Sequence, residues 1–211
     1  MKYLYDPPGI LKTIFRKYYW NTTNNKVLIT FDDGPNPDTT EIILKRLDEE
    51  NIKALFFCVG ENVQKYHSLA KQILAEGHLI GNHTYNHKVL SKISADEKLF
   101  QIENTNRIAE KELGYKIKYF RPAHGRFQLS TASLLNEYNL KNVMWSLLTY
   151  DYKNDLEVVN FAVKKYLRNN SIIVLHDSIK TKRIIQDSIS IVIDEVNNRN
   201  FQFGEADECL S

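Results

Sequence analysis

The chain lacks a strong charge of either sign. Its 28 lysines and arginines are nearly balanced by 26 aspartates and glutamates, so the formal net charge over 211 residues is only +2. Proteins that hold nucleic acid or an anionic surface by charge alone usually carry a clear excess of basic residues. The balance therefore argues against nucleic acid as a partner, and it identifies no other ligand.

Cysteine is scarce as well. Cys58 lies in the apolar run ALFFCVG, Cys209 stands near the C-terminus, and no C-x-x-C pair occurs. Two such residues do not make a disulfide framework. The cysteines consequently leave the redox environment of the protein open.

Long apolar runs are also missing. The N-terminal stretch MKYLYDPPGILKTIFRKYYW lacks the uninterrupted apolar core of a signal peptide. No later segment approaches the roughly 18 apolar residues of a membrane span. We therefore expect no transmembrane segment and, by default, a cytoplasmic protein.

Internal repeats and linker-like stretches are absent too, which favours one domain with a sizeable core. What the sequence does contain is a series of short β-rich runs, most of them apolar throughout, as parallel strands buried on both faces are. The predicted strands are residues 26–33, 53–60, 78–83, 117–122, 141–149 and 171–177, with 201–205 as a candidate seventh.

Amphipathic segments separate these strands. Helices are predicted over residues 38–50, 96–113, 156–169 and 182–198, and Gly114 follows the second of them as a helix-ending glycine does. Repeated alternation of strand and helix gives either a (β/α) barrel or a doubly wound open sheet, and about 250 residues are typical of the complete eight-unit barrel. Because this chain is shorter, a barrel with fewer strands is favoured.

Reactive side chains follow several of the predicted strands. They are Asp32 and Asp33 after the first strand, His83 after the third, Arg121 after the fourth, and His176 with Asp177 after the sixth. The carboxyl ends of the strands converge on one rim in both candidate folds, and α/β proteins place their active sites there. We therefore expect these residues to form one site.

The segment GNHTYNHK places His83 and His87 four residues apart. On a helical turn this spacing would bring both imidazoles to one cation, although such a pair alone is more often a solvated or core feature. A carboxylate on the same rim would complete a three-ligand site with a position open for water. For Asp32 and Asp33 the simpler explanation is a turn that caps the next helix, but such a cap needs one aspartate and two are present.

Motifs along the chain resemble those of the NodB-homology polysaccharide deacetylases, metal-dependent carbohydrate esterases that remove N-acetyl groups from amino-sugar polymers. The motifs are TFDDGP (30–35), HTYNH (83–87), RPAHG (121–125), WSLLTYDY (145–152) and IIVLHD (172–177). The resemblance implies a distorted (β/α) barrel of about seven strands. We expect one deacetylase domain over residues 26–211, with residues 1–25 as an N-terminal extension that packs on the barrel.

The resemblance also divides the work between the adjacent aspartates. Asp33 would bind one divalent ion together with His83 and His87, while Asp32 would be the general base and Arg121 would orient it. Zn²⁺ is the first expectation for the ion, and Co²⁺, Fe²⁺ or Mn²⁺ suit the same ligands. The implied partner is an N-acetylated glycan, such as peptidoglycan or chitooligosaccharide.

The remaining roles implied by the resemblance concern proton donation and substrate binding. His176 would be the general acid, and Asp151 would hold it protonated and correctly turned. His124 would offer its backbone N–H to the developing oxyanion, and Tyr152 and Tyr85 would contact substrate.

Some positions depart from the family pattern. Leu148 stands where an aspartate often begins the fourth motif, and Tyr152 replaces a tryptophan that usually walls the acetyl pocket. Ala123 and His124 replace a Pro-Tyr pair. The wall of the substrate groove should therefore differ from that of typical members.

One alternative is a deformylase or deacetylase of a lipid-linked or small amino sugar. Ile10, Ile14 and Tyr18 recur every four residues, with basic residues between them, as in an interfacial helix with weak contact to a membrane surface. The simpler explanation of this stripe is a short helix that closes the bottom of the barrel.

A second alternative is a non-catalytic glycan-binding module. Its groove would be lined by Tyr85, Tyr119, Tyr150 and Tyr152. The presence of both Asp32 and His176 argues against it, because binding alone requires neither a base nor an acid.

Overall fold

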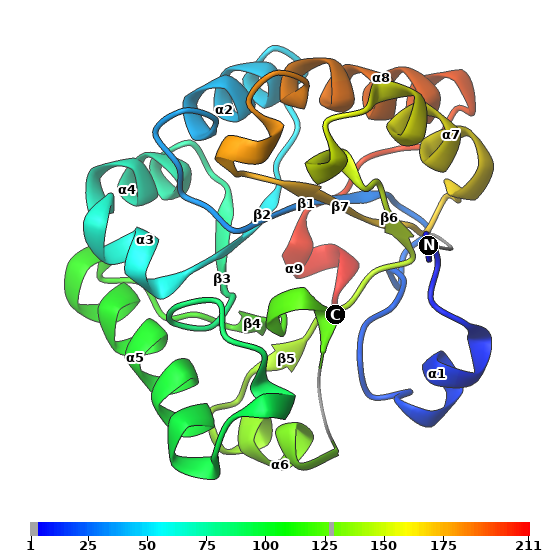
Figure 1. Ribbon diagram of the computed structural model, residues 1–211. Helices are drawn as coiled ribbons and strands as arrows, with labels where there is room; N and C mark the ends of the chain where they lie inside the picture. Colours follow the sequence, from blue (N-terminus) through cyan, green and yellow to red (C-terminus); the bar gives the residue numbers. More distant parts are fainter. Residues whose placement is uncertain (1–3, 127–128) are drawn as a thin grey trace.

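A single parallel sheet organises the computed structural model, which describes residues 4–126 and 129–211. The strands are β1 (Leu28–Asp32), β2 (Leu55–Cys58), β3 (Leu79–Asn82), β4 (Tyr119–Phe120), β5 (Lys141–Asn142), β6 (Leu147–Leu148) and β7 (Ile172–His176). Their order in the sheet is β5-β4-β3-β2-β1-β7-β6. The sheet curls into a half-barrel with helices around its outside (Figure 1), which confirms the predicted single-domain, seven-stranded distorted barrel.

Two of the predicted strands are wrong in detail. Residues 141–149 form β5 and β6 rather than one strand, because the chain between them turns to the N-terminal segment: the Met144 N–H donates to the Tyr19 carbonyl, 2.8 Å away. Residues 201–205 make only an isolated bridge, between Phe203 and Val27. The count of seven is right, but its members differ.

All four predicted helices are present, as α2 (Thr40–Asp48), α5 (Ala95–Leu113), α7 (Leu156–Tyr166) and α8 (Ile185–Asn198). Ser94 caps the start of α5, and Gly114 ends it in the left-handed conformation at φ 62°. The helix considered around Ile10 and Ile14 is present as α1 (Gly9–Ile14). Four shorter helices were not predicted: α3 (Gly60–Lys65), α4 (His67–Ala75), α6 (Leu129–Glu137) and α9 (Ala206–Cys209).

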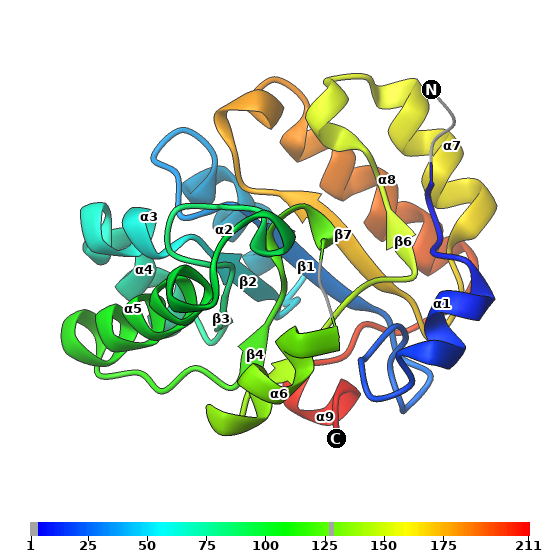
Figure 2. The same ribbon diagram turned by 60° about the horizontal axis from the view of Figure 1, so that its bottom comes forward.

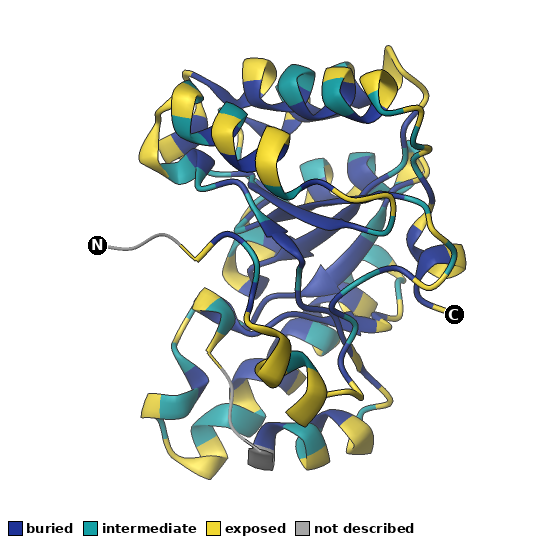
Figure 3. Ribbon diagram, turned by 90° about the vertical axis from the view of Figure 1, so that its right-hand side faces the viewer, coloured by how far each residue is buried: buried dark blue, intermediate teal, exposed yellow. Residues whose placement is uncertain are grey.

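Alternate residues of each strand face the inside and the outside of the half-barrel. Ile29 and Phe31 of β1 pack into the cluster shared with the surrounding helices. Leu28 packs instead with Leu55 and Ile172 in a separate inner cluster. Figure 3 shows the strands buried and the outer faces of the helices exposed. Asp32 lies on the same face of β1 as Leu28. The inner face of this strand therefore ends in a carboxylate at the rim where the site is predicted.

The bottom of the barrel is closed by α9 rather than by the N-terminal helix. Ala206, Cys209 and Leu210 are buried in the inner cluster with Leu28. Figure 1 shows α9 at the centre of the view, within the curve of the sheet. The opposite end of the barrel, where the strands finish, is left for the predicted site.

The N-terminal segment is held by aromatic side chains. Tyr18 and Trp20 are buried against Met144, whereas α1 buries none of its residues. Ile10 and Ile14 are 70% and 60% exposed, so core packing does not explain their spacing. Figure 2 shows α1 on the outside of the molecule. No helix in the described ranges is long and apolar enough to cross a membrane.

Candidate metal and catalytic site

The carboxyl ends of β1, β3 and β7 bring the predicted site residues together. Asp32 stands opposite His176 in the parallel register of β1 and β7, and His83 follows β3 directly. Three parallel strands of one sheet thus deliver a carboxylate and two imidazoles to one rim, as the sequence predicts.

Asp32 and Asp33 separate because the backbone bends between them. Asp33 has φ 80°, in the left-handed region that a residue with a side chain rarely adopts. Its carbonyl accepts a 2.8 Å hydrogen bond from the Asn62 side chain. Asp32 stays on the inner face of β1, where the residue is 5% exposed. The Asp33 carboxylate points elsewhere, and its Oδ1 lies 3.1 Å from His87 Nε2. One bend therefore gives two neighbouring carboxylates different partners.

The HTYNH segment is a loop, so the predicted helical turn is wrong. Thr84 and His87 both have left-handed backbones, with φ 68° and 58°. The Gln101 side chain of α5 accepts the N–H groups of Tyr85 and Asn86 at 3.0 and 3.1 Å. Contacts with distant residues, rather than i,i+4 geometry, thus bring His83 and His87 together.

Asp33, His83 and His87 can together hold one ion, since their ligand atoms all lie within 4.8 Å of one another. The His83 Nδ1–H donates to the Arg121 carbonyl at 2.8 Å, which leaves the Nε2 lone pair for a metal. Burial lowers the pKa of His83 to about 4, so this imidazole is neutral as a ligand must be. The donor set therefore fits a single divalent cation.

The Asp33 carboxylate is held in its charged form. Burial alone would raise its pKa, but the hydrogen bond from His87 and the nearby imidazoles bring the pKa well below its usual range. A charged carboxylate beside two imidazoles is a suitable ligand set for zinc or another divalent transition metal.

Asp32 is paired with Arg121, whose side chain is completely buried inside the barrel. The Arg121 Nη1 donates to Asp32 Oδ1 at 2.7 Å and also to the Thr30 hydroxyl at 2.7 Å. Its Nε donates to the Val143 carbonyl and its Nη2 to the Met144 carbonyl. Because these bonds fix the guanidinium in place, they also fix the orientation of the Asp32 carboxylate.

His176, which stands opposite Asp32 in the register of β1 and β7, is paired with Asp151. The His176 Nδ1–H donates to Asp151 Oδ1 at 2.7 Å, and the backbone N–H of His176 donates to Oδ2 at 2.7 Å. Burial alone would lower the pKa of His176, but the charge and hydrogen bond of Asp151 raise it to about 9. His176 is therefore protonated at neutral pH.

A cavity of about 230 Å³ connects these groups. It is lined by Asp32, Asp33, His83, His87, His124, Gly125, Trp145, Leu148, Tyr152, Val174, His176 and Lys180. Tyr85 is not among them, because its ring packs edge-on against Phe100 with centroids 5.4 Å apart. Tyr119 is buried and donates its hydroxyl to Asp207, so the predicted tyrosine-lined groove does not form.

Asp177 has a positioning role that the sequence reasoning missed. Its carboxylate accepts hydrogen bonds of 2.6 Å from the hydroxyls of Thr39 and Thr40, which tie the loop after β1 to the end of β7. A Cβ on Gly34 would come within 2.1 Å of this carboxylate, so glycine is required there. The late LHD run and the threonine pair are the signals that could have shown this contact.

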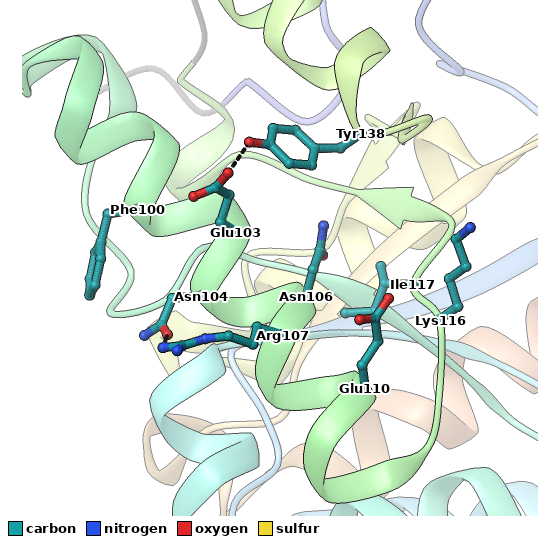
Figure 4. Close-up of a pocket in the computed structure, with 9 residues that line it drawn as sticks. All are labelled: Phe100, Glu103, Asn104, Asn106, Arg107, Glu110, Lys116, Ile117 and Tyr138. Atoms are coloured by element: carbon teal, nitrogen blue, oxygen red, sulfur yellow. Dashed lines mark hydrogen bonds between the residues drawn. The ribbon is translucent and has the colours of Figure 1, made fainter.

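A wider hollow of about 480 Å³ lies along α5, away from these residues. Figure 4 shows its lining, where Tyr138 donates to Glu103 and Arg107 donates to Asn104. It gathers neither imidazoles nor a cluster of carboxylates. The smaller cavity at the strand ends therefore remains the candidate active site.

Comparison with known proteins agrees with this geometry. The polysaccharide deacetylase family matches residues 20–143. A peptidoglycan-N-acetylglucosamine deacetylase of Bacillus cereus is 42% identical over 128 residues, which make up 61% of this chain and 46% of that relative. A second such deacetylase of that species is 33% identical over 198 residues, or 90% and 92% of the two chains.

A solved structure has a similar fold. The crystal structure of a peptidoglycan N-acetylglucosamine deacetylase superposes with a TM-score of 0.88 at 30% identity, over 96% of both chains. The chain spans less than half the length of the first Bacillus cereus relative.

The separate environments of the two aspartates predict different responses to loss of charge. Mutating a residue that only hydrogen-bonds to a metal ligand typically lowers metal affinity by roughly 10- to 100-fold. Asp33→Asn changes a ligand itself, so it should weaken the affinity for Zn²⁺ by more than this. Asp32→Asn, the matched control, should keep the ion because Asp32 is bonded to Arg121. Equilibrium dialysis with metal analysis measures both, and the opposite order of affinities would reverse the assignment.

The Asp151 contact predicts the charge of His176. In Asp151→Asn the pKa of His176 should fall from about 9 toward its ordinary 6.5, because the carboxylate that most strongly opposes burial is lost while Asp33 and Asp32 remain. NMR titration of the imidazole measures this shift, and His78, with a pKa lowered to about 4 by burial, is the internal control. An unchanged pKa for His176 would show that Asp151 does not set its charge.

Proposed function

Because the chain belongs to the polysaccharide deacetylase family, we propose that it is a metal-dependent hydrolase of acetamide groups. Its substrates are the N-acetylated amino sugars of a glycan such as peptidoglycan or chitooligosaccharide. The observation that carries this proposal is one cavity that joins a candidate metal triad to an Asp–Arg pair and a His–Asp pair. Metal-assisted hydrolysis of an amide uses all three functions: a metal to activate water, a base and an acid.

Asp33, His83 and His87 would hold the ion, and zinc is the metal we propose first because two imidazoles and a carboxylate suit it. When bound, a divalent ion supplies Lewis acidity toward the acetamide carbonyl and makes water more acidic. The Nδ1 bond of His83 to the Arg121 carbonyl keeps its Nε2 directed at Asp33, 3.7 Å away.

Asp32 would act as the general base. Its Oδ1 is engaged by Arg121, so Oδ2, which lies 3.9 Å from His83 Nε2, is the oxygen that can take a proton from water. The oxygen of that water then bonds to the acetamide carbon. Arg121 keeps the carboxylate in place as the proton arrives, and it is a positioning residue.

His176 would complete the reaction as the general acid. The C–N bond breaks with its electron pair on nitrogen, and His176 supplies the proton that turns the departing nitrogen into an amine. Since Asp151 occupies Nδ1, the proton leaves from Nε2. The products are acetate and a free amino sugar. Asp32 then loses its proton to solvent and His176 takes one up, so both groups regain their starting states.

The cavity wall suits a small acyl group. Leu148, Tyr152, Trp145 and Val174 give it an apolar side, and the Tyr152 ring stands edge-on to His176 with centroids 4.9 Å apart. We propose that the acetyl methyl lies there. His124, beside His87 with ring centroids 4.4 Å apart, would offer its backbone N–H to the oxyanion.

The proposal predicts deacetylation that depends on Asp32. Mass spectrometry of chitooligosaccharides, peptidoglycan fragments and lipid-linked amino sugars should detect loss of acetyl groups from a polymeric substrate. Asp32→Asn should lower turnover by a factor on the order of 10² to 10⁴, the usual contribution of a positioned base. Products from the lipid-linked sugar alone would favour the deacylase alternative, and binding of glycan with no product from any substrate would favour a binding module.

The exposed stripe of α1 supports a weak contact with an anionic lipid surface. Ile10 and Ile14 face solvent, and the exposed Arg16 and Lys17 lie nearby. Replacing both isoleucines by serine should reduce co-sedimentation with phosphatidylglycerol vesicles, whereas Ile179→Ser, at a residue 56% exposed elsewhere, should not. Equal sedimentation of the two variants would exclude the contact.

A further inference from the structure

Three basic side chains lie on or beside residues that line the catalytic cavity. Lys180 lines it from a 3₁₀ turn, Ile179–Thr181, that follows β7. Lys153 places its Nζ 5.5 Å from the ring centre of Tyr152, which also lines the cavity. Arg126 follows His124 by two residues, and all three basic side chains are exposed.

The Lys180 turn is fixed to the catalytic strand. The Thr181 hydroxyl donates to the His176 carbonyl at 2.8 Å, and the Thr181 side chain is buried. The Thr181 N–H donates to the Ser178 carbonyl at 2.9 Å. Lys180 is therefore presented at the cavity by a backbone that cannot move independently of His176.

The three cations have no acidic partner among the residues that the structure describes. Lys182, two residues from Lys180, differs because it is paired with Asp38 at 2.6 Å. The carboxylates inside the cavity are already engaged, Asp32 by Arg121 and Asp33 by His87. The positive charge at the mouth is consequently available to an anion from outside.

We propose that Lys153, Lys180 and Arg126 recognise a carboxylate carried by the glycan, so that the enzyme prefers an acidic polymer to a neutral one. Peptidoglycan has this chemistry, through the free carboxylates of its stem peptides or, where the peptide is missing, of its lactyl groups, whereas chitooligosaccharide does not. The inference rests on the proposed function and deepens it by naming the substrate class. The three residues set specificity, while the metal triad and the two acid–base pairs perform hydrolysis.

The test compares two substrates that differ only in charge. They are a peptidoglycan fragment with free carboxylates and the same fragment with its carboxylates converted to amides. The metal-loaded enzyme should show a higher kcat/KM for the acidic fragment, and added salt should reduce the preference. Exposed charge pairs contribute roughly two- to fivefold each, so three should give a ratio on the order of 10-fold or more.

Single variants show which residues cause the preference for the acidic fragment. Lys180→Gln and Lys153→Gln should each lower the ratio of acidic to amidated kcat/KM by about two- to fivefold, chiefly through KM, and Lys180→Glu should lower it further. Lys182→Gln, the matched control, should leave the ratio unchanged because that charge is already paired. A parent ratio near one, or an equal fall in the control, would overturn the proposal.

Binding of the same two fragments, measured by calorimetry without turnover, separates this inference from the proposed function. If neither fragment is hydrolysed but the acidic one binds more tightly in a Lys180-dependent manner, hydrolysis is the part that fails. Equal binding of both fragments would refute carboxylate recognition even if both are deacetylated.

Discussion

The buried guanidinium of Arg121 is the constraint on which the rest of the site depends. A charge inside the barrel is tolerated only if it is paired with an opposite charge and its N–H donors are hydrogen-bonded. Asp32 supplies the opposite charge for Arg121. The Thr30 hydroxyl and two carbonyls of the segment between β5 and β6 accept its other hydrogen bonds. Its own carbonyl accepts the Nδ1–H of His83. One residue therefore joins β1 to the segment that follows β5, orients the proposed base and directs a proposed metal ligand.

The bend after β1 depends on this arrangement. Asp32 is held inward by Arg121, so Asp33 can reach the histidines only if the backbone turns sharply, which its φ of 80° does. Such a conformation persists when surrounding contacts enforce it. Asn62 holds the Asp33 carbonyl, and Asp177 holds the loop through Thr39 and Thr40. The unusual backbone is thus stabilised by residues outside the reacting set.

Patterns of neighbouring residues predicted the strands, the main helices and the rim of the site. The features that were predicted wrongly depend on contacts between residues distant in the sequence. The apolar runs and amphipathic helices gave the half-barrel, and the strand ends gave the rim that carries Asp32, His83 and His176. The loop shape of HTYNH depends on Gln101, and the break in residues 141–149 on Tyr19, both distant in sequence. Likewise, no spacing rule distinguishes the buried α9 from the exposed α1.

His83 and His176 show how the surroundings of an imidazole determine its pKa and therefore its chemical role. Both lie on the same rim and both use Nδ1 as donor, yet one faces the neutral Arg121 carbonyl and the other the Asp151 carboxylate. Burial therefore prevails at His83 and lowers its pKa to about 4, whereas at His176 the carboxylate outweighs burial and raises the pKa to about 9. At neutral pH the first imidazole can donate a lone pair to a metal and the second can donate a proton. The residue type is the same at both positions, so the difference comes from the surroundings: a carboxylate opposite Nδ1 of His176, and burial together with His87 and Arg121 at His83.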